Sequence, residues 1–101
     1  MRVIVYFDLP VLTASDMKEY RKFRTYLLKT GFIMEQESVY SKLALNGNAA
    51  KFVSHDISNH APPKGVVELL TVTEKQYSNI NYITGEMNSE YINTTDRLVL
   101  L

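Results

Sequence analysis

A nearly unbroken apolar run near the start of the chain limits most strongly how this sequence can fold. Five of the six residues from Val3 to Asp8 are hydrophobic, and several are β-branched or aromatic. Such a run is typical of a buried strand. It ends at Asp8 and is closed by Leu9 and Pro10. An aspartate there either makes a turn at the strand end or supplies a carboxylate for a divalent metal, and both interpretations stay open.

Length and composition restrict the remaining possibilities. A chain of 101 residues has room for one domain with one core. Its formal net charge is zero, so nucleic-acid binding would depend on a local basic patch. Without cysteine it has neither disulfides nor thiolate zinc sites. No run approaches the length of a membrane span and the first strand begins at once, so we expect a cytoplasmic protein without a signal peptide.

A helix is expected over residues 13–30. Thr13, followed three positions later by Asp16, is a capping-box pattern with Asp in place of Glu, and Gly31 supplies a C-cap. Apolar residues at helical spacing gather on one face, which predicts packing against the core. These residues are Met17, Tyr20, Phe23, Leu27 and Leu28.

The next segments predict a pair of strands and a second helix. Residues 32–37 and 38–45 are interpreted as adjoining strands. No glycine lies at the junction of Glu37 with Ser38, so we expect a kink or bulge there. Residues 46–48 indicate a loop, after which residues 49–60 return to helical spacing and end at a pair of prolines.

The rest of the chain contains a further strand and a tail. Residues 66–72 are apolar except at Glu68 and predict another buried strand. Thr73 and Gln76 form a capping box for a short helical turn. The segment NYIT, residues 81–84, predicts a brief strand.

The order of these elements, β-α-β-β-α-β, predicts the α+β ferredoxin-like plan. In that plan the first strand is central and both helices cover one face of the sheet. We assign residues 1–84 to this domain and residues 85–101 to a C-terminal extension that ends in a short strand. The second face of the sheet needs a cover, and a homodimer is the simplest way for a small domain to provide it.

The chain ends in a strand-forming segment that the fold does not require. Four exposed aliphatic side chains there would favour aggregation, so we expect this segment to pair with a sheet edge. The edge could belong to the same subunit, to the second subunit of a dimer or to another protein. The segment is therefore our candidate for partner binding and consists of Arg97, Leu98, Val99, Leu100 and Leu101.

Basic residues of the first helix are candidates for contact with nucleic acid. Lys18, Lys22 and Lys29 fall within a narrow arc away from the apolar stripe. Such a ridge either follows a phosphate backbone or is an ordinary solvated face. Arg24 lies inside the apolar arc, where an arginine must extend to solvent, pair with an acid or reach a ligand phosphate.

The sequence contains few other signs of metal-binding or catalytic residues. His55 and His60 are five positions apart on the second helix, a spacing that does not place both on one face for a metal. The sequence contains no Gly-rich phosphate loop, no HExxH and no nucleophile–base signature. Nucleotide hydrolysis by a P-loop mechanism is thereby excluded.

Four segments occur together in one order: MRVIVYFDLP, YRKFRTYLLKTGFI, SVYSKLAL and KGVVELLTVTEKQY. With them the chain resembles the small CRISPR-associated Cas-two family of the adaptation module. It is similar to members from type II systems, which are built around a single large effector nuclease. The resemblance extends to about residue 84 and, more loosely, over the tail.

The resemblance implies a ferredoxin-like homodimer that acts in spacer acquisition, a part of antiviral defence. It implies a complex with the Cas-one integrase, in which the homodimer bridges two integrase dimers and carries duplex protospacer DNA. It also implies magnesium-dependent endonuclease activity on RNA or duplex DNA, with the metal held by one strand-end aspartate from each subunit.

These implied roles fall on particular residues of this chain. Asp8 corresponds to the catalytic and metal-binding aspartate. Tyr40 corresponds to the aromatic residue of the family's S-V-F/Y segment, and Arg21 and Arg24 to its helix arginines. Together with the three lysines of the ridge, these three residues are the candidate nucleic-acid-binding residues.

Two departures from the family pattern bear on the activity. Leu9 and Pro10 stand where polar residues often follow the aspartate, and the net charge is zero. We therefore predict a mainly architectural adaptation subunit, with magnesium-dependent cleavage as an additional activity. The alternative is a small ligand-binding regulatory dimer without nuclease activity, since ferredoxin-like dimers serve many functions. A ligand pocket at the dimer interface would favour that alternative.

Overall fold

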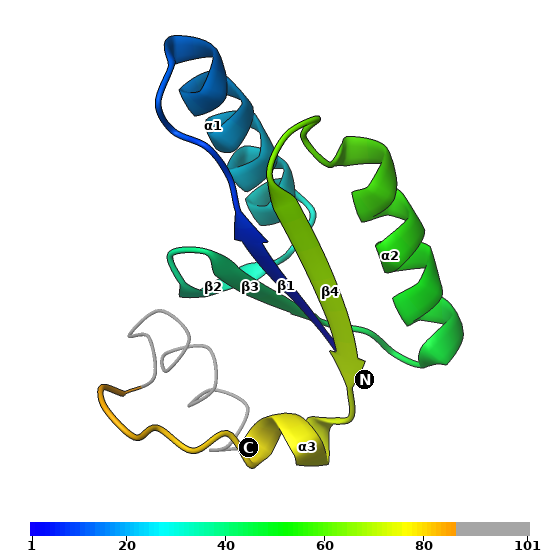
Figure 1. The fold of residues 1–101 in the computed structure, drawn as a ribbon. Coiled ribbons are helices and arrows are strands. Elements are labelled where there is room, and N and C mark those ends of the chain that lie inside the picture. Colours follow the sequence, from blue (N-terminus) through cyan, green and yellow to red (C-terminus); the bar gives the residue numbers. More distant parts are fainter. Residues whose placement is uncertain (87–101) are drawn as a thin grey trace.

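The computed structural model describes residues 1–86, which form a four-stranded sheet with two long helices on one side (Figure 1). A short third helix follows the last strand. In chain order the elements are β1 (Arg2–Asp8), α1 (Ala14–Lys29), β2 (Ile33–Gln36), β3 (Val39–Leu43), α2 (Gly47–His60), β4 (Val66–Val72) and α3 (Glu74–Ser78).

The strands lie in the order β2-β3-β1-β4, and each neighbouring pair is antiparallel. Because β1 is central, Ile4 lies opposite Ser41 of β3 on one side and Leu70 of β4 on the other. With a helix after β1 and another after β3, this is the ferredoxin-like arrangement that the order of elements predicts.

Local side-chain contacts explain where α1 begins and ends. The Thr13 side chain accepts a hydrogen bond from the backbone N–H of Asp16, and the Asp16 carboxylate accepts one from the N–H of Thr13. This is the predicted capping box. The helix ends just before Gly31, whose φ of 98° is in the left-handed region that favours glycine.

Three other details of the secondary structure differ from the predictions. α2 begins two residues earlier than predicted, because the Asn46 side chain caps it by accepting from the N–H of Ala49. β2 and β3 meet in a tight turn, and the predicted bulge lies just before it, between Met34 and Gln36. The strand predicted for residues 81–84 is wrong, since these residues are irregular or bent and belong to no strand among residues 1–86.

The side of the sheet that faces the helices contains the core. Val3 and Val5 are both 0% exposed, and Phe23 and Leu27 of α1 belong to the same cluster. Leu28 was predicted to lie on this face but is 45% exposed. Consecutive helix residues are about 100° apart, so Leu28 lies at the edge of the apolar stripe instead of beneath it.

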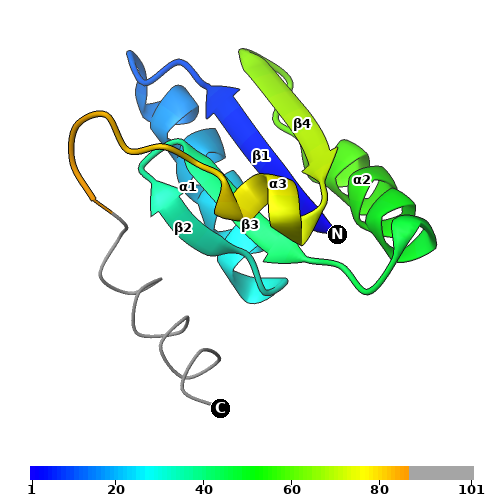
Figure 2. The same cartoon turned by 90° about the horizontal axis from the view of Figure 1, so that it is seen from below.

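The other side of the sheet has no long helix over it, and we call it the open face (Figure 2). Side chains alternate between the two sides of a strand, and directly paired residues share a side. Val3 and Val5 of β1 face the core, so the residues that alternate with them, and the residues paired with those, lie on the open face. At its uncovered end these are Ile4, Tyr6 and Asp8 of β1, with Val66, Glu68 and Leu70 of β4.

α3 covers one end of the open face and is held there by a polar cluster (Figure 2). The Arg2 guanidinium makes two 2.9 Å hydrogen bonds to the Glu74 carboxylate and lies 4.3 Å from the centre of the Tyr77 ring. The Tyr77 hydroxyl donates to Glu35, which also accepts from Ser41 at 2.6 Å. α3 thus occupies the end of this face at which β1 begins.

Part of the predicted organisation lies beyond these residues. The strand predicted for residues 97–101 lies outside the described residues, and the boundary at residue 84 stays a prediction. Among residues 1–86, no helix is both long and apolar enough to cross a membrane.

Candidate functional site

Asp8 is the last residue of β1, and its exposed carboxylate lies on the open face. An aspartate that formed a turn would accept a hydrogen bond from a following backbone N–H. Within residues 1–86 the Asp8 side chain makes no hydrogen bond and no ion pair. Its carboxylate is therefore available for a ligand.

The start of β4 holds the Asp8 backbone in place. Gly65 has a φ of 87°, and a Cβ atom built on it would lie 2.5 Å from the carbonyl oxygen of Asp8. Only glycine satisfies both the backbone conformation and the close approach. The two strands are therefore packed tightly where β1 ends.

Glu68 provides a second carboxylate on the open face, and sequence reasoning did not select it as a site residue. The register pairs Glu68 with Tyr6 and Val66 with Asp8, so Glu68 and Asp8 are diagonal neighbours on adjacent strands. Such neighbours are about 7–8 Å apart, within reach of long side chains. Glu68 is also exposed, without a hydrogen bond or ion pair in the described part of the chain.

A signal for Glu68 was present but incomplete. A single acid in an otherwise apolar strand is conspicuous, yet the sequence does not show which residue of another strand lies beside it. That relation depends on the register between β1 and β4, which are distant in the chain.

These carboxylates suit a magnesium ion in the chemistry of their donors. Magnesium prefers oxygen ligands and is commonly held by one or two protein carboxylates together with water and substrate oxygens. No group of three or more potential metal ligands occurs within residues 1–86. One chain therefore offers the carboxylates of Asp8 and Glu68, and a second copy would double that number.

The basic residues of α1 lie on the other side of the sheet from Asp8. Helix α1 covers the core side, whereas the Asp8 carboxylate lies on the open face (Figure 1). All five basic side chains are exposed, and the structure does not bring them together with Asp8 in one site. They are Lys18, Arg21, Lys22, Arg24 and Lys29.

Arg24 is paired with a buried tyrosine. Its Nε donates a 2.9 Å hydrogen bond to the hydroxyl of Tyr40, which is 0% exposed. This hydrogen bond is the main reason why the pKa of Arg24 is raised above its ordinary value. Because Tyr40 is buried, its predicted role in nucleic-acid binding would operate through the guanidinium that it orients.

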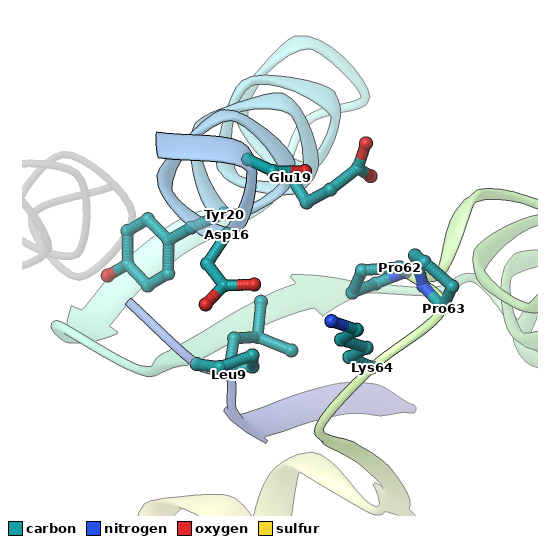
Figure 3. Close-up of a pocket in the computed structure, with 9 residues that line it drawn as sticks. Leu9, Asp16, Glu19, Tyr20, Pro62, Pro63 and Lys64 are labelled. Atoms are coloured by element: carbon teal, nitrogen blue, oxygen red, sulfur yellow. The ribbon is translucent and has the colours of Figure 1, made fainter. Parts of the chain in front are cut away.

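A small cleft lies between the first turns of α1 and the loop from α2 to β4 (Figure 3). Leu9, Pro62 and Pro63 contribute apolar walls, while Asp16 and Lys64 point into it. The cleft lies on the helix side of the sheet and is separate from the Asp8 carboxylate. It is not a pocket of the open face, where the ligand-binding alternative requires one.

Both histidines are exposed, and His60 helps to join the two long helices. Its ring stacks on Tyr26 at a centroid distance of 4.2 Å, and the Tyr26 hydroxyl donates to Asp56 at 2.5 Å. Burial, followed by this hydrogen bond, raises the pKa of Tyr26, so its hydroxyl stays protonated. The cluster links α1 to α2.

Residues 1–80 match the protein family described as CRISPR associated protein Cas2. The chain belongs to the Cas2 family. It is therefore a CRISPR protein of the adaptation module, as the four sequence segments predicted.

Relatives cover the full chain. A Treponema denticola protein named CRISPR-associated endoribonuclease Cas2 is 54% identical over 101 residues. The alignment covers 100% of this chain and 100% of that protein. A Streptococcus mutans protein of the same name is 48% identical, over 100% of this chain and 93% of its own length. A crystal structure of Streptococcus pyogenes Cas2 at pH 6.5 matches with a TM-score of 0.61 and 14% identity, covering 83% of this chain and 100% of that one. At that identity the structural match shows the common fold.

Proposed function

We propose that this Cas2 protein is a homodimeric subunit of the spacer-acquisition complex, in which it bridges Cas-one integrase dimers and binds duplex DNA. The observation that carries the proposal is the uncovered apolar part of the open face. In a single chain Val66 and Leu70 remain 54% and 49% exposed. Each Å² of apolar surface removed from water contributes about 25 cal/mol, which favours a protein cover.

A second copy is the cover that suits this face. In a twofold contact the same surface of each subunit meets the other. Since α3 occupies one end of the open face, the contact would form at the other end, where Asp8 lies. This placement would bring the Asp8 side chains of the two subunits towards each other, as the proposed metal site requires.

The proposed additional activity is cleavage of a phosphodiester by water. A bound magnesium ion would activate that water and neutralise charge developing on the phosphate. Asp8 of each subunit would hold the ion through its carboxylate oxygens, and the close packing at Gly65 would keep the two strand ends in position. Among the described residues both histidines lie on α2, so proton acceptance would fall to solvent or to a carboxylate of the open face.

The ridge of Lys18, Lys22 and Lys29 is the proposed contact with duplex DNA, with Arg21 and Arg24 beside it. Contacts with phosphates fix a protein on DNA without reading its sequence, as a subunit that accepts many different spacers requires. The ridge lies on the helix side of the sheet, so it would stay accessible when two open faces meet.

The segment from Arg97 to Leu101 is the proposed contact between subunits or with the integrase. It is apolar and strand-forming, and a sheet edge on a second chain would satisfy its backbone hydrogen bonds. We favour the edge of the dimer mate.

The decisive experiment is co-purification with the Cas-one integrase of the same operon, followed by a spacer-integration assay with and without this protein. A matched pair of variants connects the assay to the open face. Leu70→Glu places a charge on that face, whereas Leu45→Glu places one at a side chain that is 91% exposed in the loop before α2.

We expect Leu70→Glu to abolish dimer formation and spacer integration, and Leu45→Glu to retain both. A protein that neither binds the integrase nor affects integration would refute the proposal and favour the ligand-binding alternative.

A further inference from the structure

A hollow lies between the two long helices, on the helix side of the sheet. Glu19 and Lys22 line it from α1, and Asn59 and His60 line it from the last turn of α2. Lys22 belongs to the lysine ridge and makes no hydrogen bond or ion pair within residues 1–86. The hollow therefore joins the ridge to a part of α2 that the proposed DNA surface does not include.

The ring of His60 is held in one orientation at this hollow. It stacks on Tyr26 at a centroid distance of 4.2 Å, with an angle of 10° between the two planes. Its Nδ1 lies 2.9 Å from the backbone carbonyl oxygen of Asp56. Because a carbonyl oxygen only accepts, this contact assigns the hydrogen of the neutral ring to Nδ1. Nε2 is then the nitrogen that gains a proton, and it makes no hydrogen bond within residues 1–86.

The charged groups that face His60 leave this nitrogen open to an anion. On α1 these groups are Glu19 and Lys22, whose formal charges cancel. On α2 the Asp56 carboxylate lies 4.0 Å from Nδ1 and already accepts a hydrogen bond from the hydroxyl of Tyr26. Histidine is the side chain that changes its charge near neutral pH, so protonation of His60 adds a positive N–H donor to a hollow that contains Lys22. A phosphate group is an anion that suits two such donors.

We propose that His60 extends the lysine ridge onto α2 and contacts a phosphate of duplex DNA when its ring is protonated. This inference rests on the DNA contact proposed for the ridge and adds a residue and a pH dependence to it. Each phosphate contact adds about 0.9 to the slope of log affinity against log salt. At about pH 6 the slope should therefore be steeper than at about pH 8, by about 0.9 for each subunit whose His60 contacts DNA.

Two substitutions remove the titrating ring in different ways. His60→Gln keeps a polar side chain that cannot become charged, and His60→Phe keeps an aromatic ring for the stack on Tyr26. Circular dichroism verifies the fold of each variant. In both, the salt slope should be the same at the two pH values. His55→Gln is the control, because it removes the other exposed histidine of α2 from outside the hollow, and it should keep the full difference.

The measurement is fluorescence anisotropy of the full chain with a labelled DNA duplex, at several salt concentrations and at both pH values. A parent that binds the duplex with the same slope at both pH values would overturn the inference and leave the proposed function standing. An undiminished pH difference in the folded His60 variants would assign the titration to another group and overturn the inference as well. A parent that binds no duplex at either pH would refute the proposed DNA contact and this inference with it.

Discussion

Replacing Gly65 by alanine would test how firmly the start of β4 holds the end of β1. The added Cβ would lie 2.5 Å from the Asp8 carbonyl oxygen and 2.9 Å from Cδ2 of Leu9. The Leu9 side chain can adjust, but the Asp8 oxygen belongs to the backbone and cannot turn away. Either the turn at residue 65 or the strand end that carries Asp8 must therefore move.

The expected cost of Gly65→Ala has two components. A left-handed backbone conformation costs a residue with a Cβ roughly 1–2 kcal/mol. Forcing an extra carbon into a packed position costs typically about 1–3 kcal/mol more. We therefore expect the free energy of unfolding to fall by about 2–5 kcal/mol, against the roughly 5–15 kcal/mol of a typical domain.

Gly85 offers a matched control for the backbone component. Its φ is 85°, close to the 87° of Gly65, but an added Cβ would have no atom of residues 1–86 within 4 Å. Gly85→Ala should therefore cost at most about 1–2 kcal/mol. Urea unfolding followed by tyrosine fluorescence suits both variants, because the chain has seven tyrosines and no tryptophan.

Equal losses of stability in the two glycine variants would refute the packing argument. The cleavage assay provides a second criterion. The assay uses buffer without urea, at a temperature at which Gly65→Ala is still folded. Magnesium-dependent cleavage should then be reduced, because the Asp8 carboxylate is displaced. Full cleavage by a folded Gly65→Ala protein would show that the close contact does not position Asp8.

Three further changes address the remaining proposals. Asp8→Asn should abolish magnesium-dependent cleavage and leave the dimer folded; undiminished cleavage by the purified variant would exclude Asp8 as a metal ligand. Changing Lys18, Lys22 and Lys29 to Gln should weaken duplex binding and reduce the slope of log affinity against log salt by about 2.7, at about 0.9 per phosphate contact. The measurement is fluorescence anisotropy, and an unchanged affinity would place the DNA surface elsewhere. A control triple variant with Gln at Lys51, Lys64 and Lys75 removes the same amount of charge from outside the ridge. A chain ending after Thr95 should keep its core by circular dichroism but sediment with a weaker dimer or weaker integrase binding; full strength in both would make the tail a local edge cover.

Features that depend on neighbours in the chain were predictable from the sequence. The hydrogen bonds of the capping boxes at Thr13 and Thr73 join residues only three positions apart, and both are present. The boundaries of β4 follow from a mostly apolar run with a glycine before it. The element order was then sufficient for the topology, because few sheet arrangements accommodate β-α-β-β-α-β.

Features that depend on distant parts of the chain were not predictable in the same way. The diagonal relation of Asp8 to Glu68 requires the register of two strands that are far apart in sequence. The attachment of α3 likewise requires Arg2 to meet Glu74.

Of the candidate site, the exposure of the lysine ridge followed from helical spacing. The pairing of Arg24 did not, because its partner Tyr40 is a neutral buried hydroxyl on strand β3 and not an acid. Composition and spacing identify which residues need a partner, but packing selects the partner.

The central position of β1 has a consequence for how the protein is made. This strand is synthesised first, and β3 can pair with one of its edges as soon as residues 39–43 are available. Its other edge stays unpaired until β4, residues 66–72, has left the ribosome. During that interval an apolar strand exposes free N–H and C=O groups, a state that favours association with other chains. Slow synthesis between β3 and β4 should therefore lower the soluble yield in cells, even though the stability of the finished protein is unchanged.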